Sequence, residues 1–165
     1  MQIVPLNRDN VAYATQIAKE LHALGVFGRE GPEFDWAYSL GAFTDIIDDP
    51  RFYARYAVDD DGIYVGAVVG HVEPFWFAPK LMAIEDGWYV REGTPSRAKI
   101  AMKLMRGFID WAYGHEDCWL VQTGDIAAAN SYAVDTLYRH MGFTRFGTMY
   151  RYMRDGSDVV SKRSA

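Results

Sequence analysis

Two adjacent acids, Glu85 and Asp86, interrupt an otherwise apolar run that extends from Met82 to Val90. A buried carboxylate costs free energy unless it is paired. Acids in such a run therefore indicate either a proton acceptor or an ion pair with a neighbouring arginine. Because consecutive strand residues face opposite sides of a sheet, only one of the two can point into a given cleft. The other must find a partner or solvent.

The apolar run leads through a short polar turn into a segment with helical periodicity. A helix that starts directly after a strand presents free backbone N–H groups, which favour a phosphate or another anion. Arg97 and Lys99 lie at this helix start, where cations interact unfavourably with the helix dipole. They are either solvated charges or contacts to an anion, and their placement favours the second interpretation.

The composition indicates one folded domain. The chain has 165 residues, of which 50% are hydrophobic, and this is enough to bury a core. We assign residues 1–154 to the domain and residues 155–165 to a flexible polar tail. The net charge of −5 and the pI near 5.3 work against a broad nucleic-acid-binding face and suit a cationic or neutral substrate.

Cys118 is the only cysteine, so no intrachain disulfide can form and a reducing compartment is expected. The first residues lack the pattern of a signal peptide, and no run approaches the roughly 18 apolar residues of a membrane span. We therefore expect a cytoplasmic protein with no membrane association. No metal is expected, because the histidines are scattered and the acidic segment 59–62 lies where a hairpin needs a turn.

Hydrophobic periodicity and turn residues predict the elements of the fold. The expected strands are residues 2–6, 52–58, 63–72, 81–90, 119–123 and 144–154. The expected helices are a first one that is capped by Asn7, Asp9 or Asn10 and stopped by Gly25, followed by residues 36–47, 100–112 and 128–141. The order β-α-α-β-β-β-α-β-α-β indicates an α/β (α+β) fold, with a mixed central sheet and helices on both faces.

The end of the last predicted helix carries Tyr138, Gly142 and Phe143 in a Tyr-x-x-x-Gly-Phe pattern. With the element order and the strand-turn-helix segment 84–104, this pattern resembles the Gcn5-related N-acetyltransferase (GNAT) family, and particularly acetyltransferases encoded by tailed bacteriophages. The resemblance spans Ile3 to about Arg154. It implies transfer of an acetyl group from acetyl-CoA to a primary amine of a small molecule or protein by direct attack, in the host cytoplasm if the protein is phage-encoded.

The resemblance also implies a cofactor site. The family's Gln/Arg-x-x-Gly-x-Gly/Ala signature falls on Ser96 to Ala101, where only Ala101 matches strictly and Lys99 replaces the central glycine. This departure motivates an alternative, a catalytically silent protein of the same fold that acts as a phage structural or host-protein-binding module. The expected acetyl-CoA contacts are Trp88, Tyr89, Val90, Arg91, Ser96, Arg97, Ala98, Lys99, Ile100, Ala101, Asn130 and Ser131.

By the same resemblance, Tyr138 lies near the thioester sulfur and protonates the leaving thiolate. A phenol suits this task because it can donate a proton and stays protonated at neutral pH. The alternative is that Tyr138 packs in the core, as aromatic residues of amphipathic helices commonly do. For the base that deprotonates the amine, the resemblance favours Glu85, with Asp86 as the substitute.

The acceptor amine is expected to contact two loops. The predicted contacts are Phe27, Glu30, Glu33 and Phe34 in the first loop, and Phe75 and Trp76 in the second. Acids among aromatic rings attract a cationic amine. The aromatic residues could equally form a lid or the contact surface of a homodimer. His71, on a predicted hairpin strand, either faces the cleft or has a structural role.

Overall fold

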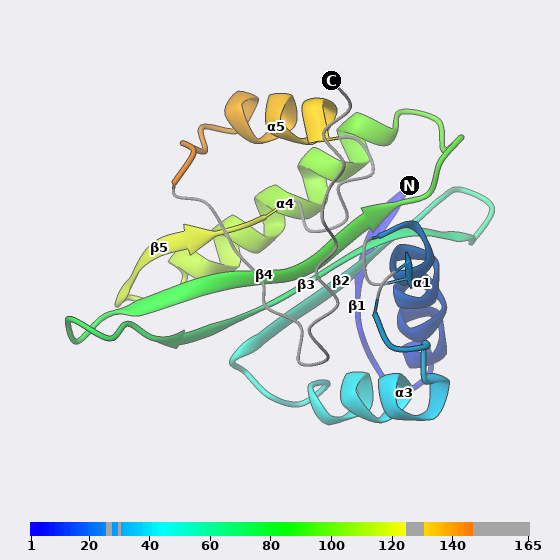
Figure 1. Ribbon diagram of the computed structural model, residues 1–165, viewed down its shortest axis with the longest axis horizontal. Helices are drawn as coiled ribbons and strands as arrows, with labels where there is room; N and C mark the ends of the chain where they lie inside the picture. Colours follow the sequence, from blue (N-terminus) through cyan, green and yellow to red (C-terminus); the bar gives the residue numbers. More distant parts are fainter. Residues whose placement is uncertain (26–27, 30, 125–130, 147–165) are drawn as a thin grey trace, which may run out of the picture.

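A mixed five-stranded sheet forms the centre of the computed structural model, which describes residues 1–25, 28–29, 31–124 and 131–146 (Figure 1). The strands lie side by side in sequence order, and each neighbouring pair is antiparallel except the last, in which β5 runs parallel to β4. The strands are β1 (Gln2–Pro5), β2 (Phe52–Val58), β3 (Tyr64–Pro74), β4 (Leu81–Val90) and β5 (Cys118–Gln122).

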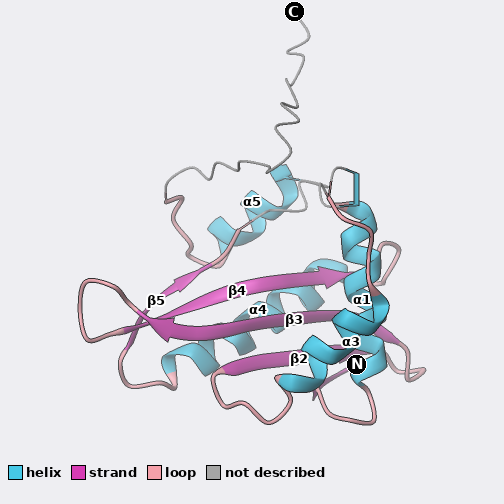
Figure 2. Cartoon of the chain, turned by 60° about the horizontal axis from the view of Figure 1, so that its bottom comes forward, coloured by secondary structure: helices cyan, strands magenta, loops and turns pink. Residues whose placement is uncertain are grey.

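Helices cover both faces of the sheet (Figure 2). One face packs against α1 and α3, and the other against α4, with α5 beside it. The helices are α1 (Val11–Leu24), α3 (Trp36–Asp45), α4 (Arg97–Tyr113) and α5 (Ser131–His140). This arrangement confirms the predicted fold class and the order of the elements that the structure describes.

Helix α4 anchors the core because its apolar stripe matches the sheet face beneath it. Ile100, Leu104 and Phe108 recur at helical spacing, and all three are buried. The Phe108 ring lies directly over Gly70 of β3, where a Cβ atom would come within 2.6 Å of a ring carbon. The absence of a side chain at Gly70 therefore sets how closely α4 approaches the sheet.

Most predicted boundaries agree with the structure, and the differences have local causes. Helix α3 ends at Asp45 rather than at residue 47, because Ile46–Asp49 form turns. Strand β3 runs on to Pro74 since its pairing with β4 continues to that residue. The described part of the last predicted strand, residues 144–146, is not a strand, and its remainder and the tail lie outside the described residues. Within the described chain, no helix is long and apolar enough to span a membrane.

Replacing Gly70 with alanine is expected to lower the free energy of unfolding by about 1–3 kcal/mol, as overpacking of a core does. The new Cβ would lie 2.5 Å from the Ile84 carbonyl oxygen and 2.6 Å from the Phe108 ring. Gly41→Ala is the matched control, because Gly41 lies within α3 with no atom within 4 Å of its Cβ position. The control should gain about 0.5–1 kcal/mol of stability. Urea denaturation measures both, and a Gly70→Ala protein as stable as the wild type would contradict this packing.

Candidate active site

Strands β4 and β5 separate part-way along β4. Their parallel pairing runs from Leu81 opposite Cys118 to Ile84 opposite Gln122, where β5 ends. Strand β4 continues to Val90. Beyond Ile84, no residue of β5 lies opposite β4 among the described residues. We refer to this place as the β4–β5 gap.

A β-bulge in β4 lies at the start of the gap. In the β3–β4 ladder, Val69 pairs with Gly87 and Gly70 pairs with Glu85, so Asp86 is the extra residue. An extra residue shifts the alternation of side chains by one position. As a result Glu85 and Trp88 lie on the α4 side of the sheet, although they are three residues apart, and Tyr89 packs on the opposite side.

The bulge separates the two predicted acids. Glu85 is 9% exposed, and its Oε2 lies 2.7 Å from Thr123 Oγ1. Asp86 is partly exposed on the other face, where its Oδ2 lies 2.8 Å from His71 Nδ1. The sequence required the two side chains to face opposite sides, and the structure places them so.

A chain of hydrogen bonds joins Glu85 to Tyr138. Thr123 Oγ1 lies 2.7 Å from both the Glu85 carboxylate and the Tyr138 hydroxyl. The threonine hydroxyl has one hydrogen, and an ionised carboxylate can only accept. Thr123 therefore donates to Glu85 and accepts from Tyr138, whose oxygen accepts a 2.5 Å hydrogen bond from Trp88 Nε1. Although Tyr138 also packs against the core, its hydroxyl belongs to this polar chain.

Thr123 is the member of the chain that sequence reasoning missed. It was predicted as the end of a strand with no chemical role, although it is a polar residue immediately after β5. A hydroxyl at the point where two strands part is the signal that could have singled it out. That signal has meaning only once the strand partners are known.

The start of α4 leaves backbone donors available. The N–H groups of Lys99 and Ile100 donate to the Ser96 carbonyl, and that of Arg97 donates to Thr94. The Ala98 N–H has no acceptor among the described residues, and the first turn of α4 contains no acid. Ser96 adopts the left-handed conformation with φ 58°, which turns the chain into the helix.

The two arginines near this turn, Arg97 and Arg91, donate hydrogen bonds to different parts of the fold. Arg97 Nε donates to the Val90 carbonyl at the end of β4. Arg91 donates to both carboxylate oxygens of Glu20 on α1, at 2.7 and 2.8 Å, and its Nη1 donates to the Tyr64 carbonyl. The Arg91 guanidinium thus joins α1 to the end of β4, in addition to its predicted contact with acetyl-CoA.

The remaining predicted contacts are distributed over the fold. Of the cofactor contacts, the side chains of Val90, Ile100 and Ala101 are buried in the core, which leaves only their backbone for a ligand. Phe34 packs edge-on against His22 of α1, and Glu33 is exposed. Phe27, Glu30 and Asn130 lie outside the described residues, as does the side chain of Ser131.

The aromatic loop between β3 and β4 lies at the opposite end of β4 from the start of α4 (Figure 1). In it, Phe75 contacts Trp119 of β5 with ring centroids 5.1 Å apart, and Trp76 is 87% exposed. The loop therefore lies away from the start of α4, and its predicted contact with the acceptor amine stays a prediction.

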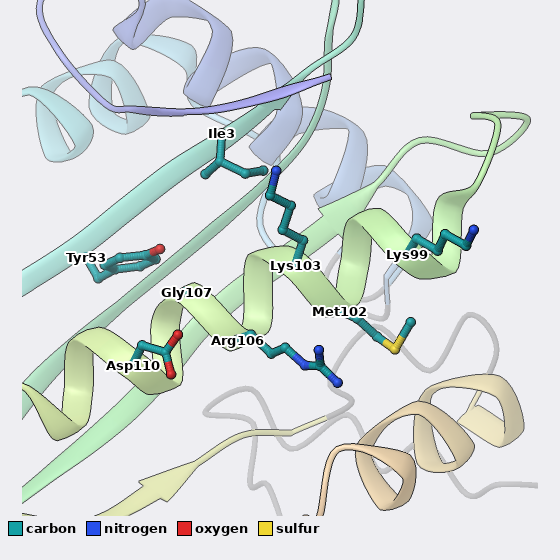
Figure 3. A pocket seen from close by; sticks show the side chains of 8 residues that line it. All are labelled: Ile3, Tyr53, Lys99, Met102, Lys103, Arg106, Gly107 and Asp110. Carbon is teal, nitrogen blue, oxygen red and sulfur yellow. The ribbon is translucent and has the colours of Figure 1, made fainter.

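A groove on the outer side of α4 is separate from this chemistry. It lies between α4 and strands β1 and β2, and touches neither Glu85 nor Tyr138 (Figure 3). Its lining residues are Ile3, Tyr53, Lys99, Met102, Lys103, Arg106, Gly107 and Asp110. Among the described residues, no group of three or more His, Cys, Asp or Glu side chains is arranged so that it could hold a metal ion.

Comparison with known proteins gives a match in structure alone. No known protein-family profile and no curated protein sequence matches the chain. A solved protein described as a probable acetyltransferase superposes with a TM-score of 0.72 at 14% identity, covering 93% of this chain and 96% of that one. The aminoglycoside acetyltransferase AAC(6')-Iy, in complex with a CoA-linked bisubstrate analogue, gives 0.71 at 15% identity, covering 93% and 97%. This chain has the GNAT acetyltransferase fold.

The GNAT fold does not by itself specify a reaction. A solved transcriptional regulator from Bacillus halodurans shares the fold with a TM-score of 0.70 at 17% identity, covering 92% of this chain and 99% of that one. The reaction of this GNAT-fold protein has to be argued from its own residues in the β4–β5 gap.

The Glu20–Arg91 pair predicts a pH-dependent part of the stability. Hydrogen bonds from Arg91 hold the pKa of Glu20 below its ordinary value. A carboxyl with a depressed folded-state pKa stabilises the fold above its unfolded-state pKa, and this stabilisation is lost as the pH falls through the folded-state pKa. We expect Glu20→Gln to lower the free energy of unfolding by about 1 kcal/mol at neutral pH, with the difference shrinking towards pH 3.

Urea denaturation at both pH values measures this effect. Asp135→Asn is the control, because it removes an exposed ion pair with Arg139 on α5 and should change stability too little to detect. A Glu20→Gln defect of the same size at both pH values would contradict the role of the charge.

Proposed function

We propose that this protein is an N-acetyltransferase that moves an acetyl group from acetyl-CoA to a primary amine of a small molecule or protein by direct attack. The observation that carries the proposal is the hydrogen-bonded chain of Glu85, Thr123 and Tyr138 at the β4–β5 gap. Such a chain holds a phenol beside the place where the β4–β5 pairing ends, in position to donate a proton. The GNAT fold supports the same reaction class.

The residues around the gap suit acetyl-CoA. The start of a long helix with a free Ala98 N–H and no acid in its first turn favours the diphosphate. Arg97 and Lys99 add positive charge at this helix start. The β4–β5 gap after Ile84 lies beside β4, where the amide-containing arm of the cofactor could run along the strand. Lys99 replaces the family's glycine, but it occupies the outer side of α4, where it lines the groove of Figure 3.

Acetyl-CoA supplies an acyl thioester, and side chains of the protein donate and accept the protons. Tyr138 donates its proton to the developing thiolate, because a phenol is protonated at neutral pH. The Trp88 N–H bonded to the Tyr138 oxygen stabilises the charge left on it. Glu85 orients Thr123, and Thr123 orients the phenol. Glu85 and Asp86 are the two proposed acceptors for the amine proton, one on each face of β4.

A catalytically silent binding module is the second candidate. Trp76 and Phe77 are 87% and 89% exposed, and neighbouring exposed aromatic rings are typical of a contact surface. Such a surface would also suit a homodimer. These interactions, the cytoplasmic location and the bacteriophage relationship stay predictions from the sequence.

Tyr138→Phe is expected to lower kcat by about 100-fold, the usual contribution of a positioned general acid, with little change in acetyl-CoA affinity. Calorimetric titration with acetyl-CoA measures the affinity, and thiol release in the presence of a panel of primary amines measures kcat. Tyr132→Phe is the matched control, since Tyr132 lies on the same helix but is 83% exposed. It should behave as the wild type.

Two results would count against this proposal. Absence of any acetyl-CoA binding would favour the silent module. Binding with transfer that is equally fast in Tyr138→Phe, Glu85→Gln and the wild type would leave the reaction standing but remove these residues from it.

A further inference from the structure

A second cluster of titratable side chains lies on the face of β4 opposite Glu85. His71 of β3 has its Nδ1 atom 2.8 Å from Asp86 Oδ2, and its Nε2 atom 3.7 Å from Glu73 Oε2. The His71 side chain is 24% exposed, and the two carboxylates are 38% and 39% exposed. The cluster is therefore held in place while remaining open to a solute.

The sheet register builds this cluster. The neighbours of His71 in β3, Gly70 and Val72, both face α4, so His71 faces the side of α1 and α3. The bulge turns Asp86 to the same side. On β2, Phe52 pairs with His71, and its ring centroid lies 5.5 Å from the imidazole. The imidazole is thus fixed by a ring on one side and a carboxylate on the other.

The hydrogen bond to Asp86 defines which nitrogen can act. An ionised carboxylate only accepts, so the proton of neutral His71 lies on Nδ1. The lone pair is then on Nε2, whose 3.7 Å separation from Glu73 is beyond hydrogen-bond reach. The free Nε2 can accept a proton, and the carboxylate bonded to Nδ1 holds the ring in one orientation. This is the arrangement of a general base.

The cluster lies at the bulge that opens the β4–β5 gap. Tyr138 and Thr123 reach the gap from the side of α4 and α5, whereas Asp86 and His71 belong to the other face. An amine can therefore approach from one face while the thiolate leaves towards the other. The charged groups around His71 are Asp86 from β4 and Glu73 from β3, and both attract an ammonium ion. Phe52 from β2 is uncharged, and no charged group of α1 or α3 contacts His71 among the described residues.

We propose that His71, in place of Glu85 or Asp86 themselves, is the general base of the acetyl transfer proposed above, and that Asp86 is its positioning residue. His71 Nε2 takes one proton from the ammonium form of the acceptor. The amine nitrogen then bonds to the acetyl carbon as the carbon–sulfur bond breaks, and the thiolate takes the Tyr138 proton. The second proton lost by the nitrogen passes to solvent, His71 releases its proton to solvent, and Tyr138 is reprotonated from solvent.

The test compares two acceptors that differ in their need for a base. 1,5-Diaminopentane is protonated at neutral pH, whereas hydroxylamine is uncharged there and already nucleophilic. We expect His71→Gln to reduce kcat with 1,5-diaminopentane by about 100-fold. Its rate with hydroxylamine, corrected for the uncatalysed reaction, should change less than about threefold. Raising the pH should narrow the defect of His71→Gln with 1,5-diaminopentane.

Two further variants complete the test. Asp86→Asn should show the same selectivity between the acceptors with a smaller loss of kcat. His115→Gln, a histidine substitution on the far side of the sheet, is the control and should show no loss with either acceptor.

A second measurement uses the free protein. Long-range proton–nitrogen NMR of the ¹⁵N-labelled chain reports which ring nitrogen of neutral His71 carries the proton. Nδ1 is expected in the wild type, and a mixture of tautomers is expected in Asp86→Asn. Protonation of Nε2 in the wild type would overturn the proposal.

The kinetic outcomes separate this proposal from the acetyl transfer on which it rests. Equal losses with both acceptors in His71→Gln would assign His71 a structural role, and no loss with either would remove it from the reaction. Both results overturn the base while leaving the transfer intact. A wild-type protein that binds acetyl-CoA but releases no thiol with either acceptor would overturn the transfer, and with it the base.

Discussion

The pairing of strand β4 with its two neighbouring strands differs in length. It pairs antiparallel with β3 from Leu81 to Val90, but it pairs with β5 only up to Ile84. The bulge at Asp86 lies where the second pairing stops, and an extra residue at this point bends a strand and increases its twist. Without the bulge, Glu85 and Trp88 could not share a face. The candidate site depends on this one irregularity.

The buried acid in the site is tolerated because it is bonded. Glu85 is 9% exposed, and an isolated carboxylate at that burial would be costly. Thr123 donates to it, and the same threonine accepts from Tyr138, so the cost of burial is offset by a chain that also orients the phenol. Each member depends on a different element. The chain can therefore form only when β4, β5 and α5 are packed together.

On the other face of β4, the charged groups are partly exposed to solvent instead of buried. The cluster of Asp86, His71 and Glu73 is partly exposed to solvent, where a charge has a lower free energy than in the protein interior. The bulged strand thus carries an enclosed hydrogen-bonded chain on one face and an open histidine–carboxylate cluster on the other, and the proposed reaction uses both. Helix α4 covers the face that carries Glu85, since Phe108 packs against Gly70, which pairs with Glu85. Packing in the core and the placement of the reactive groups are thus parts of one constraint.

The sequence by itself determined the elements and their order, because helical and strand periodicity, glycine stops and the acidic hairpin turn are local signals. It also determined that Glu85 and Asp86 diverge, since alternation along a strand is a local rule. The partners of these acids were decided only by the tertiary structure. Thr123 and Tyr138 meet Glu85 across 38 and 53 residues of chain, through pairings that no local pattern encodes. The bulge that brings Trp88 to the same face, and sets His71 behind Asp86, arises from the register between strands, which is fixed when the sheet assembles.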